Sequence, residues 1–341
     1  MSSKKGVYII VLVVSIFLTL GFSVVAIAVY AFPLKIPEEN VSKIPNIESS
    51  NLDASSNTTN TSSIASSYNE SSNTPDDYDG KITKAFLSPY ISNTSFRNIY
   101  LNNKTNTDID LSDIYETSLA LRINKCKEPE VLILHTHATE GYLTQEKDYY
   151  NQEDIEQTYD QERSVIKIGE IICQELSEYG IVAIHDKTLH DDPSYTNSYN
   201  RSSETTLKYL EKYPSIKIVI DIHRDSISSN DGLIRGVSEQ NGHDAAQIMF
   251  VAGSETGNVE GFPNWKQNLA LVLRLQEISE TLYPGFARSI FFTSKKYNQH
   301  LSTGSLLIEV GSSVNTIKEA EYSAKLLGRI LGIGLNIIAE E

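Results

Sequence analysis

The chain has 341 residues, 40% of them hydrophobic, and a formal net charge of −15 at pH 7. The apolar content is sufficient for a large core, whereas the acidic balance argues against a nucleic-acid surface, which requires clustered Lys and Arg. We therefore expect no nucleic-acid partner. The two cysteines, Cys126 and Cys173, form no CxxC motif and are too few for a disulfide framework. Cys173 lies in an apolar helical pattern and is predicted to be a buried thiol, with a bridge to Cys126 left open.

The first 34 residues have the composition of a membrane anchor. No residue from Gly6 to Leu34 is charged. The apolar run from Val7 to Phe32 is long enough to cross a bilayer as one helix of roughly 20 residues. Lys4 and Lys5 precede it, and basic residues stay on the cytoplasmic side of a membrane. We therefore expect a single-pass anchor, with the rest of the chain outside the cytoplasm.

A cleaved signal peptide is the alternative for this segment. Ala26 and Ala28 offer a cleavage pattern of two small residues separated by one other residue. The apolar stretch, however, is longer than the core of a typical signal peptide. The length favours the anchor.

A polar segment separates the anchor from the remainder of the chain. It is rich in Ser, Asn, Thr, Asp and Glu and cannot bury enough surface to offset the entropy of ordering. We therefore predict four regions. They are a cytoplasmic tip with a transmembrane anchor (1–34), a disordered polar linker (35–83), an N-terminal extension (84–127) and a catalytic domain (128–341).

Short apolar runs alternate with amphipathic stretches throughout residues 128–341. Strands are predicted at 131–134, 181–184, 216–222, 248–252 and 306–310. Helices are predicted at 165–179, 203–213 and 264–283, and a last one, opened by Thr316 and Glu319 at capping-box spacing, extends to Ile338. This alternation predicts an α/β fold, with a largely parallel, twisted sheet and helices on both faces. Catalytic groups are expected at the carboxyl ends of its strands.

Three polar clusters fall at the predicted strand ends. The segment from His135 to Glu140 follows strand 131–134, His223 follows 216–222, and Glu309 interrupts 306–310. Imidazole and carboxylate are the usual ligands of a catalytic zinc, which takes three protein groups and leaves a position for water. Glu is seldom buried without a partner, so a Glu within an apolar strand is a candidate catalytic residue.

Each of these residues also has a structural interpretation. A single His at a strand end is more often hydrogen-bonded than metal-bound. His223 stands among Asp221, Arg224 and Asp225, a pattern that is also typical of a surface ion network. The remaining histidines are interpreted as solvated or structural; they are His185, His190, His243 and His300.

Several motifs resemble those of one known family. The segments HTHATEGY (135–142), DIHRDS (221–226) and IEVG (308–311), in this order, resemble the stage II sporulation protein P family of endospore-forming Firmicutes. The segments DPSY (192–195), SYNRS (198–202) and YNQ (297–299) fit as well. The resemblance extends from about Asn102 to the carboxyl terminus. It implies a zinc-dependent N-acetylmuramoyl-L-alanine amidase, which cleaves the bond between N-acetylmuramic acid and the first alanine of the stem peptide. It also implies some activity on peptide cross-links.

The resemblance implies a role for particular residues. His135, Glu140 and His223 are expected to bind Zn²⁺, and Glu309 is expected to be the catalytic carboxylate. His137 is expected either to support these ligands or to replace one of them. Three further residues are expected to support the site or to contact substrate; they are Arg224, Tyr199 and Asn298.

The resemblance also implies a cellular setting. The substrate is expected to be peptidoglycan, and the partners stage II sporulation protein D and stage II sporulation protein M. The catalytic domain is expected in the space between the mother-cell and forespore membranes, where it would act in septal wall thinning and engulfment. Two alternatives stay open, namely a zinc cell-wall endopeptidase without amidase activity and a non-catalytic sporulation scaffold.

Overall fold

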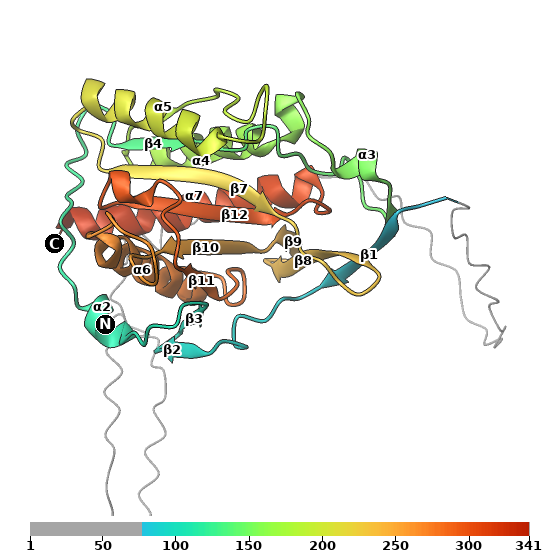
Figure 1. Cartoon of the computed structure of the whole chain (residues 1–341), viewed down its shortest axis with the longest axis horizontal. Coiled ribbons are helices and arrows are strands. Elements are labelled where there is room, and N and C mark those ends of the chain that lie inside the picture. The colour runs from blue at the N-terminus through green and yellow to red at the C-terminus, as the bar shows by residue number, and fades with distance from the viewer. Residues whose placement is uncertain (1–76, 341) are drawn as a thin grey trace, which may run out of the picture. The chain divides into compact units, whose positions relative to one another are not determined.

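The computed structural model describes residues 77–340, which form a mixed α/β fold (Figure 1). The predicted anchor (1–34) and most of the predicted linker lie outside the described residues. The larger of two sheets has eight strands in the order β2-β3-β11-β10-β12-β7-β4-β6. In chain order these are β2 (Thr94–Phe96), β3 (Ile99–Asn103), β4 (Val131–Leu134), β6 (Ala183–His185), β7 (Ile218–Asp225), β10 (Ile248–Gly253), β11 (Ile290–Thr293) and β12 (Ser305–Ser312).

The sheet is largely parallel, as predicted. Strands β6, β4, β7 and β12 are paired in parallel, as are β10 with β11 and β11 with β3. The pairs β10–β12 and β2–β3 are antiparallel. The five strands predicted from the sequence correspond to β4, β6, β7, β10 and β12.

Helices cover both faces of this sheet, because its central strands are apolar on both sides. The main helices are α4 (Val165–Glu178), α5 (Ser198–Lys212), α6 (Trp265–Leu282) and α7 (Ile317–Glu340). On one face, Ile218 and Ile220 of β7 belong to a core that also contains residues of α4, α6 and α7. On the other face, Leu132 and Val219 pack against Leu210 of α5.

The connections place the carboxyl ends of three central strands at one edge of the sheet. From β4 the chain passes through α4 outward to β6, then returns through α5, on the opposite face, to β7. A parallel sheet changes its direction of winding at such a point, and the strand ends there form a crevice. In register, Leu134 lies beside Asp221, and Glu309 lies beside His223.

The longest described helix, α7, is a core helix. Its segment Ile317–Ala339 is the one helix among residues 77–340 that is apolar and long enough to span a membrane, but 78% of its apolar window is buried inside the fold. Its predicted capping box is present. The backbone N–H of Thr316 donates to the carboxylate of Glu319 at 2.9 Å, and the backbone N–H of Glu319 donates to Thr316 Oγ1 at 3.3 Å.

The second sheet was not predicted from the sequence. Its order is β5-β1-β8-β9, with β1 (Gly80–Ala85), β5 (Tyr149–Tyr150), β8 (Gly232–Gln240) and β9 (His243–Ala246). Strands β8 and β9 are joined by Asn241 and Gly242, which have φ values of 52° and 79°. An Asn-Gly pair is the strongest short-range signal for a hairpin, because both central residues of this turn need positive φ.

The predicted linker, 35–83, is wrong for its last residues, since Gly80 to Thr83 belong to β1. The N–H of Lys81 donates to Asp231 O at 3.0 Å, and that of Ile82 donates to Asp148 O at 2.8 Å. These partners come from distant parts of the chain, so a polar local composition did not reveal them. The extension, 84–127, also contributes β2, β3 and the short helix α2 (Leu111–Tyr115), and β3 pairs with β11.

Three short elements and the cysteines complete the description. They include the helix α3 (Gln152–Ile155) and the 3₁₀ turns η1 (Gln161–Arg163) and η2 (Gln299–Leu301). Cys126 and Cys173 are both free thiols. Burial raises the pKa of Cys173 on α4 to about 12, so this thiol is unreactive near neutral pH, as expected of a structural cysteine.

Two amino-terminal deletions should separate the predicted boundary from the observed one. Deleting residues 1–76 should leave the described fold intact. Deleting 1–83 should lower the melting temperature by roughly 5 to 10 °C relative to the shorter deletion, because about 2 to 3 kcal/mol of strand hydrogen bonds and Ile82 packing is lost. Thermal melts followed by circular dichroism would measure this difference. Equal melting temperatures would mean that β1 does not stabilise the fold.

Candidate active site

His223 and Glu309 are direct neighbours in the parallel pairing of β7 with β12. Their side chains therefore project from the same face of the sheet. The register shifts between Glu309 and Ser312, and Gly311 within this bulge has a φ of 67°. Bulges of this kind often occur beside active sites, where they end regular pairing and change the direction of a side chain.

Glu140 reaches this pair from the loop after β4. Its Oε2 atom lies 3.4 Å from His223 Nδ1 and accepts a hydrogen bond from the backbone N–H of Arg224 at 3.0 Å. The Arg224 guanidinium is directed elsewhere and donates from Nη2 to Ile155 O at 3.0 Å. The structure thus brings Glu140, His223 and Glu309 together, as the sequence indicated.

His137 completes this cluster. Its ring centroid lies 5.2 Å from that of His223, with the two rings nearly perpendicular. The residue is only 4% exposed, and its Nδ1 atom is buried without a hydrogen-bond partner among the described residues. A buried polar atom without a partner is costly and calls for an explanation such as a bound ion.

His135 does not join the cluster. Its Nδ1 donates to Ile222 O at 3.0 Å, so the neutral ring accepts through Nε2 from His185 Nε2 at 2.8 Å. Burial, followed by the nearby His185, lowers the pKa of His135 to about 3. Both rings lie against α4, where a Cβ atom at Gly169 would come within 2.9 Å of His135 Nε2 and 2.6 Å of His185 Nε2. The prediction that His135 joins Glu140 and His223 is therefore contradicted by the geometry.

Asp221 supports the cluster from within β7. Its Oδ1 lies 3.0 Å from His223 Nε2 and accepts from the Thr136 N–H at 2.8 Å. Its Oδ2 accepts from Thr136 Oγ1 at 2.6 Å. A carboxylate on the far nitrogen of a histidine fixes the ring's orientation and raises its basicity. We expected Asp221 in an ion network, and its spacing of two residues from His223 on one strand was the signal for this closer role.

The loop before α5 holds the other end of the ligand-bearing segment. Asp191 Oδ2 accepts from Thr139 Oγ1 at 2.6 Å, and His190 Nδ1 donates to His135 O at 2.8 Å. Asp191 and His190 are both buried. These contacts confirm the structural interpretation of His190, whereas nothing in the local sequence indicated Asp191.

The residues predicted to support the site include Tyr199 and Asn298, which the structure links. Asn298 Nδ2 donates to Tyr199 O at 2.7 Å and to Ser202 Oγ at 3.1 Å. Ser202 Oγ in turn lies 2.8 Å from Thr136 Oγ1. Since Thr136 donates its own proton to Asp221, Ser202 is the donor in this contact.

The carboxylates and imidazoles of the cluster shift one another's pKa. Burial tends to raise the pKa of Glu140, but His223 and Arg224 outweigh it and hold that pKa below its ordinary value. Burial tends to lower the pKa of His223, but Asp221 and Glu140 raise it well above its ordinary value. Burial raises the pKa of Glu309 to about 8, with His223 opposing the rise and Glu140 adding to it. A carboxyl group with a pKa near neutrality suits general acid and base catalysis.

A second acidic group lies near the amino end of α7. Ligand atoms of Glu146, Asp244 and Glu319 all lie within 4.8 Å of one another. Arg235 is already among them, with Nη1 2.8 Å from Glu146 Oε2 and 3.7 Å from Glu319 Oε1, and Lys84 pairs with Asp244. Because basic side chains already balance these carboxylates, we assign no metal to this group.

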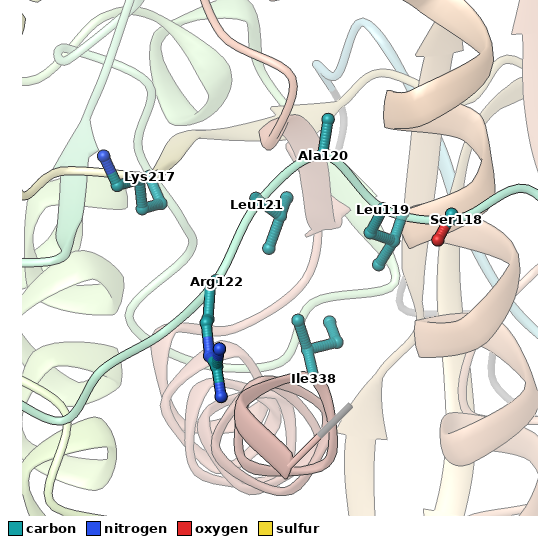
Figure 2. Close-up of a pocket in the computed structure, with 7 residues that line it drawn as sticks. All are labelled: Ser118, Leu119, Ala120, Leu121, Arg122, Lys217 and Ile338. Carbon is teal, nitrogen blue, oxygen red and sulfur yellow. The ribbon is translucent and has the colours of Figure 1, made fainter.

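A pocket of about 430 Å³ lies at the opposite edge of the main sheet (Figure 2). Lys217, directly before β7, and Ile338, near the end of α7, line it together with the strap Ser118 to Arg122. No His, Asp or Glu lines this pocket. It therefore lacks the groups needed for metal-dependent hydrolysis.

A family model described as Stage II sporulation protein P matches residues 32–332. The chain belongs to the stage II sporulation protein P family. A member of this family, Stage II sporulation protein P of Bacillus subtilis (strain 168), is 29% identical over 207 residues. The match covers 57% of this chain and 48% of that protein, so the chain spans about half the length of its relative.

Among solved structures, this family member is similar to two amidases. The N-acetylmuramoyl-L-alanine amidase AmiC2 of Nostoc punctiforme is 12% identical, with a TM-score of 0.35 over 62% of this chain and 98% of that one. The CwlD amidase from Clostridioides difficile, solved with the GerS lipoprotein, is 14% identical, with a TM-score of 0.36 and the same coverage. Similarities of this size carry no argument about chemistry.

Replacing Glu309 by Gln should change the pH dependence of stability in metal-free protein. Because the folded pKa is about 8 and the ordinary value is 4.5, the fold binds this proton more tightly than the unfolded chain does. Its contribution to stability is complete below pH 4.5 and is lost as pH rises through 8. The wild-type melting temperature should therefore fall relative to that of Glu309→Gln between pH 5 and 8. Melts of both chelator-treated proteins would test this, and a constant difference would refute the raised pKa.

Proposed function

We propose that the chain is a zinc-dependent peptidoglycan hydrolase of sporulation, which cleaves the amide between N-acetylmuramic acid and the first alanine of the stem peptide. Family membership supports the sporulation role. The observation that carries the chemistry is the convergence of His137, Glu140 and His223 beside Glu309. Cleavage of peptide cross-links is proposed as a second activity of the same site.

We assign His137, Glu140 and His223 as the zinc ligands. Two imidazoles and one carboxylate are a usual donor set for catalytic zinc. The buried, unpartnered Nδ1 of His137 fits a bound cation, and the 3.4 Å approach of Glu140 to His223 gathers the other donors. His135 is not assigned, since both of its ring nitrogens already have partners.

The metal supplies one part of the chemistry. Bound zinc lowers the pKa of water toward roughly 7 and polarises a carbonyl oxygen. Asp221 keeps the His223 ring oriented through the contact at Nε2 and prevents it from rotating away.

Glu309 carries the proton transfers. Its Oε2 atom is buried and has no hydrogen-bond partner among the described residues, so it is free to accept a proton. Glu309 removes a proton as water adds to the amide carbon, then returns it to the departing nitrogen as the C–N bond breaks. The products are the lactyl carboxylate of N-acetylmuramic acid and a stem peptide with a free amino-terminal alanine.

The alternative enzyme is a zinc endopeptidase that cuts only cross-links. Digestion of purified peptidoglycan with the full chain, followed by mass spectrometry, separates the two. An amidase releases whole stem peptides and leaves unsubstituted glycan, whereas an endopeptidase leaves every stem attached to its sugar. A chain that releases neither product, with zinc bound, would favour the non-catalytic scaffold.

The cellular setting is part of the proposal. The apolar run of residues 1–34 supports a single-pass anchor, and the lysines before it support an extracytoplasmic catalytic domain. We propose that the domain acts between the mother-cell and forespore membranes. Stage II sporulation protein D and stage II sporulation protein M are the proposed partners.

The two histidines of the HTH motif should differ in their effect on zinc. His137→Ala should weaken zinc affinity by more than about 100-fold, because removing a ligand costs more than removing a residue that only orients one. His135→Ala is the matched control and should keep zinc, although it lowers the melting temperature by deleting the hydrogen bond to Ile222. Zinc per folded chain, measured by atomic emission, checks both. Zinc loss in the His135 variant alone would restore His135 as the ligand.

Glu309→Gln should abolish most turnover while keeping the site assembled. It retains the shape of the side chain but removes the group that accepts the proton, so hydrolysis should fall by about 10² to 10⁴. Zinc content should not change, because Glu309 is not an assigned ligand. Product release, zinc content and melting temperature should be measured on one preparation. A folded, zinc-loaded variant with normal activity would remove Glu309 from the mechanism.

A further inference from the structure

Tyr195 lies flat against an assigned zinc ligand. Its ring is nearly parallel to that of His137, at an interplanar angle of 5° and a centroid distance of 4.0 Å. The residue is nevertheless 61% exposed. One face of the phenol ring therefore packs on the ligand, while the other is available to a molecule that enters the site.

Two further tyrosines stand on the same cluster. The Tyr199 ring lies 5.7 Å from that of His137 and 6.4 Å from that of His223. The Tyr297 ring lies 5.9 Å from that of Tyr199. These three residues, Tyr195, Tyr199 and Tyr297, are called here the tyrosine wall. They come from the loop before α5, from α5 itself and from the loop after β11.

The backbone that holds the tyrosine wall is strained. Tyr297 and Asn298 are consecutive non-glycine residues with φ values of 47° and 58°. Such conformations cost free energy, and they persist where the surrounding structure enforces them, often at functional sites. Here Asn298 also donates to Tyr199 O, so one strained turn positions Tyr297 and fixes the start of α5.

The charge around the tyrosine wall selects against an anionic ligand. Burial raises the pKa of each phenol, and the Glu309 carboxylate raises it further, so all three hydroxyls stay protonated near neutral pH. Glu140 and Asp191 add negative charge near Tyr195. Stem-peptide carboxylates would be repelled from such a surface, whereas neutral sugar rings would not be.

We propose that the tyrosine wall is a subsite for a neutral pyranose ring of the glycan strand, next to the scissile amide. This proposal rests on the proposed function. One face of a pyranose presents C–H groups, which carry partial positive charge, and the face of an aromatic ring carries partial negative charge. The exposed face of Tyr195 stacks on the sugar, and the neutral phenols donate hydrogen bonds to its hydroxyl groups.

The basic side chains of the site come from different elements. Arg224 lies in β7, and Arg288, in the loop before β11, pairs with Asp225 at 2.8 Å. The Nε atoms of both guanidinium groups are buried and unpartnered among the described residues. The stem peptide, with its carboxylates, is therefore directed toward these arginines and away from the tyrosine wall.

Binding of the separated halves of the substrate tests this subsite without requiring turnover. The protein is the full chain in detergent, carrying Glu309→Gln to prevent hydrolysis. The probes are an oligosaccharide of alternating N-acetylglucosamine and N-acetylmuramic acid without stem peptides, and a free stem peptide. Tyr195→Ala should weaken oligosaccharide binding about tenfold, leave stem-peptide binding unchanged and keep zinc bound. Tyr195→Trp should retain the oligosaccharide affinity, since it preserves the stacking face.

The matched control is Tyr90→Ala. Tyr90 is 52% exposed and packs edge-on against Tyr100, between β1 and β2, so its removal should change neither affinity. The proposal is overturned if Tyr195→Ala binds the oligosaccharide as tightly as the parent, or weakens both probes equally. It is also overturned if the weakening follows a loss of zinc, because Tyr195 would then only support His137.

The outcomes for the subsite and for the enzyme are distinguishable. A chain that binds the oligosaccharide through Tyr195 but never cleaves peptidoglycan would refute the proposed function and leave the subsite. A chain that cleaves peptidoglycan, while Tyr195→Ala leaves oligosaccharide affinity unaltered, would refute only the subsite.

Discussion

The parallel pairing of β7 with β12 is the interaction on which the candidate site depends. It sets His223 beside Glu309 from segments more than 80 residues apart, and it places Asp221 two residues earlier on the same face. Residues one strand apart in register have fixed separations, so neither side chain needs a flexible loop to reach the other. Only Glu140 and His137 arrive from a loop, and buried hydrogen bonds through Thr136 and Thr139 hold that loop.

Much of the main sheet was predictable because its strands and helices alternate along the chain with clear periodicity. The apolar runs at β4, β7 and β12 and the amphipathic patterns of α4, α6 and α7 depend on local composition. The second sheet was missed because its stability depends on pairing between remote segments. β1 is polar on its exposed side and β8 contains two glycines, so neither has the pattern of a buried strand. Only the Asn241-Gly242 turn carried a local signal.

The site was predictable in its residue types but not in every position. Glu140, His223 and Glu309 were selected because polar groups at strand ends converge in a parallel sheet, and the structure brings them together. The choice between His135 and His137 depended on where β4 ends and how the chain then turns. That turn directs His135 to the face covered by α4, where Gly169 makes room for it. A motif in which both residues are histidine contains no information about this direction.

The position of β1 has a mechanical consequence. It is an inner strand of the second sheet, hydrogen-bonded to β5 on one side and to β8 on the other, and it begins within four residues of the first described residue. If the preceding segment tethers the protein to a membrane, any tension in that tether enters the fold at Gly80. A pull along a strand loads the hydrogen bonds of both ladders together rather than one after another. The fold would therefore resist displacement of its anchor, as a hydrolase working on a stiff polymer close to a membrane requires.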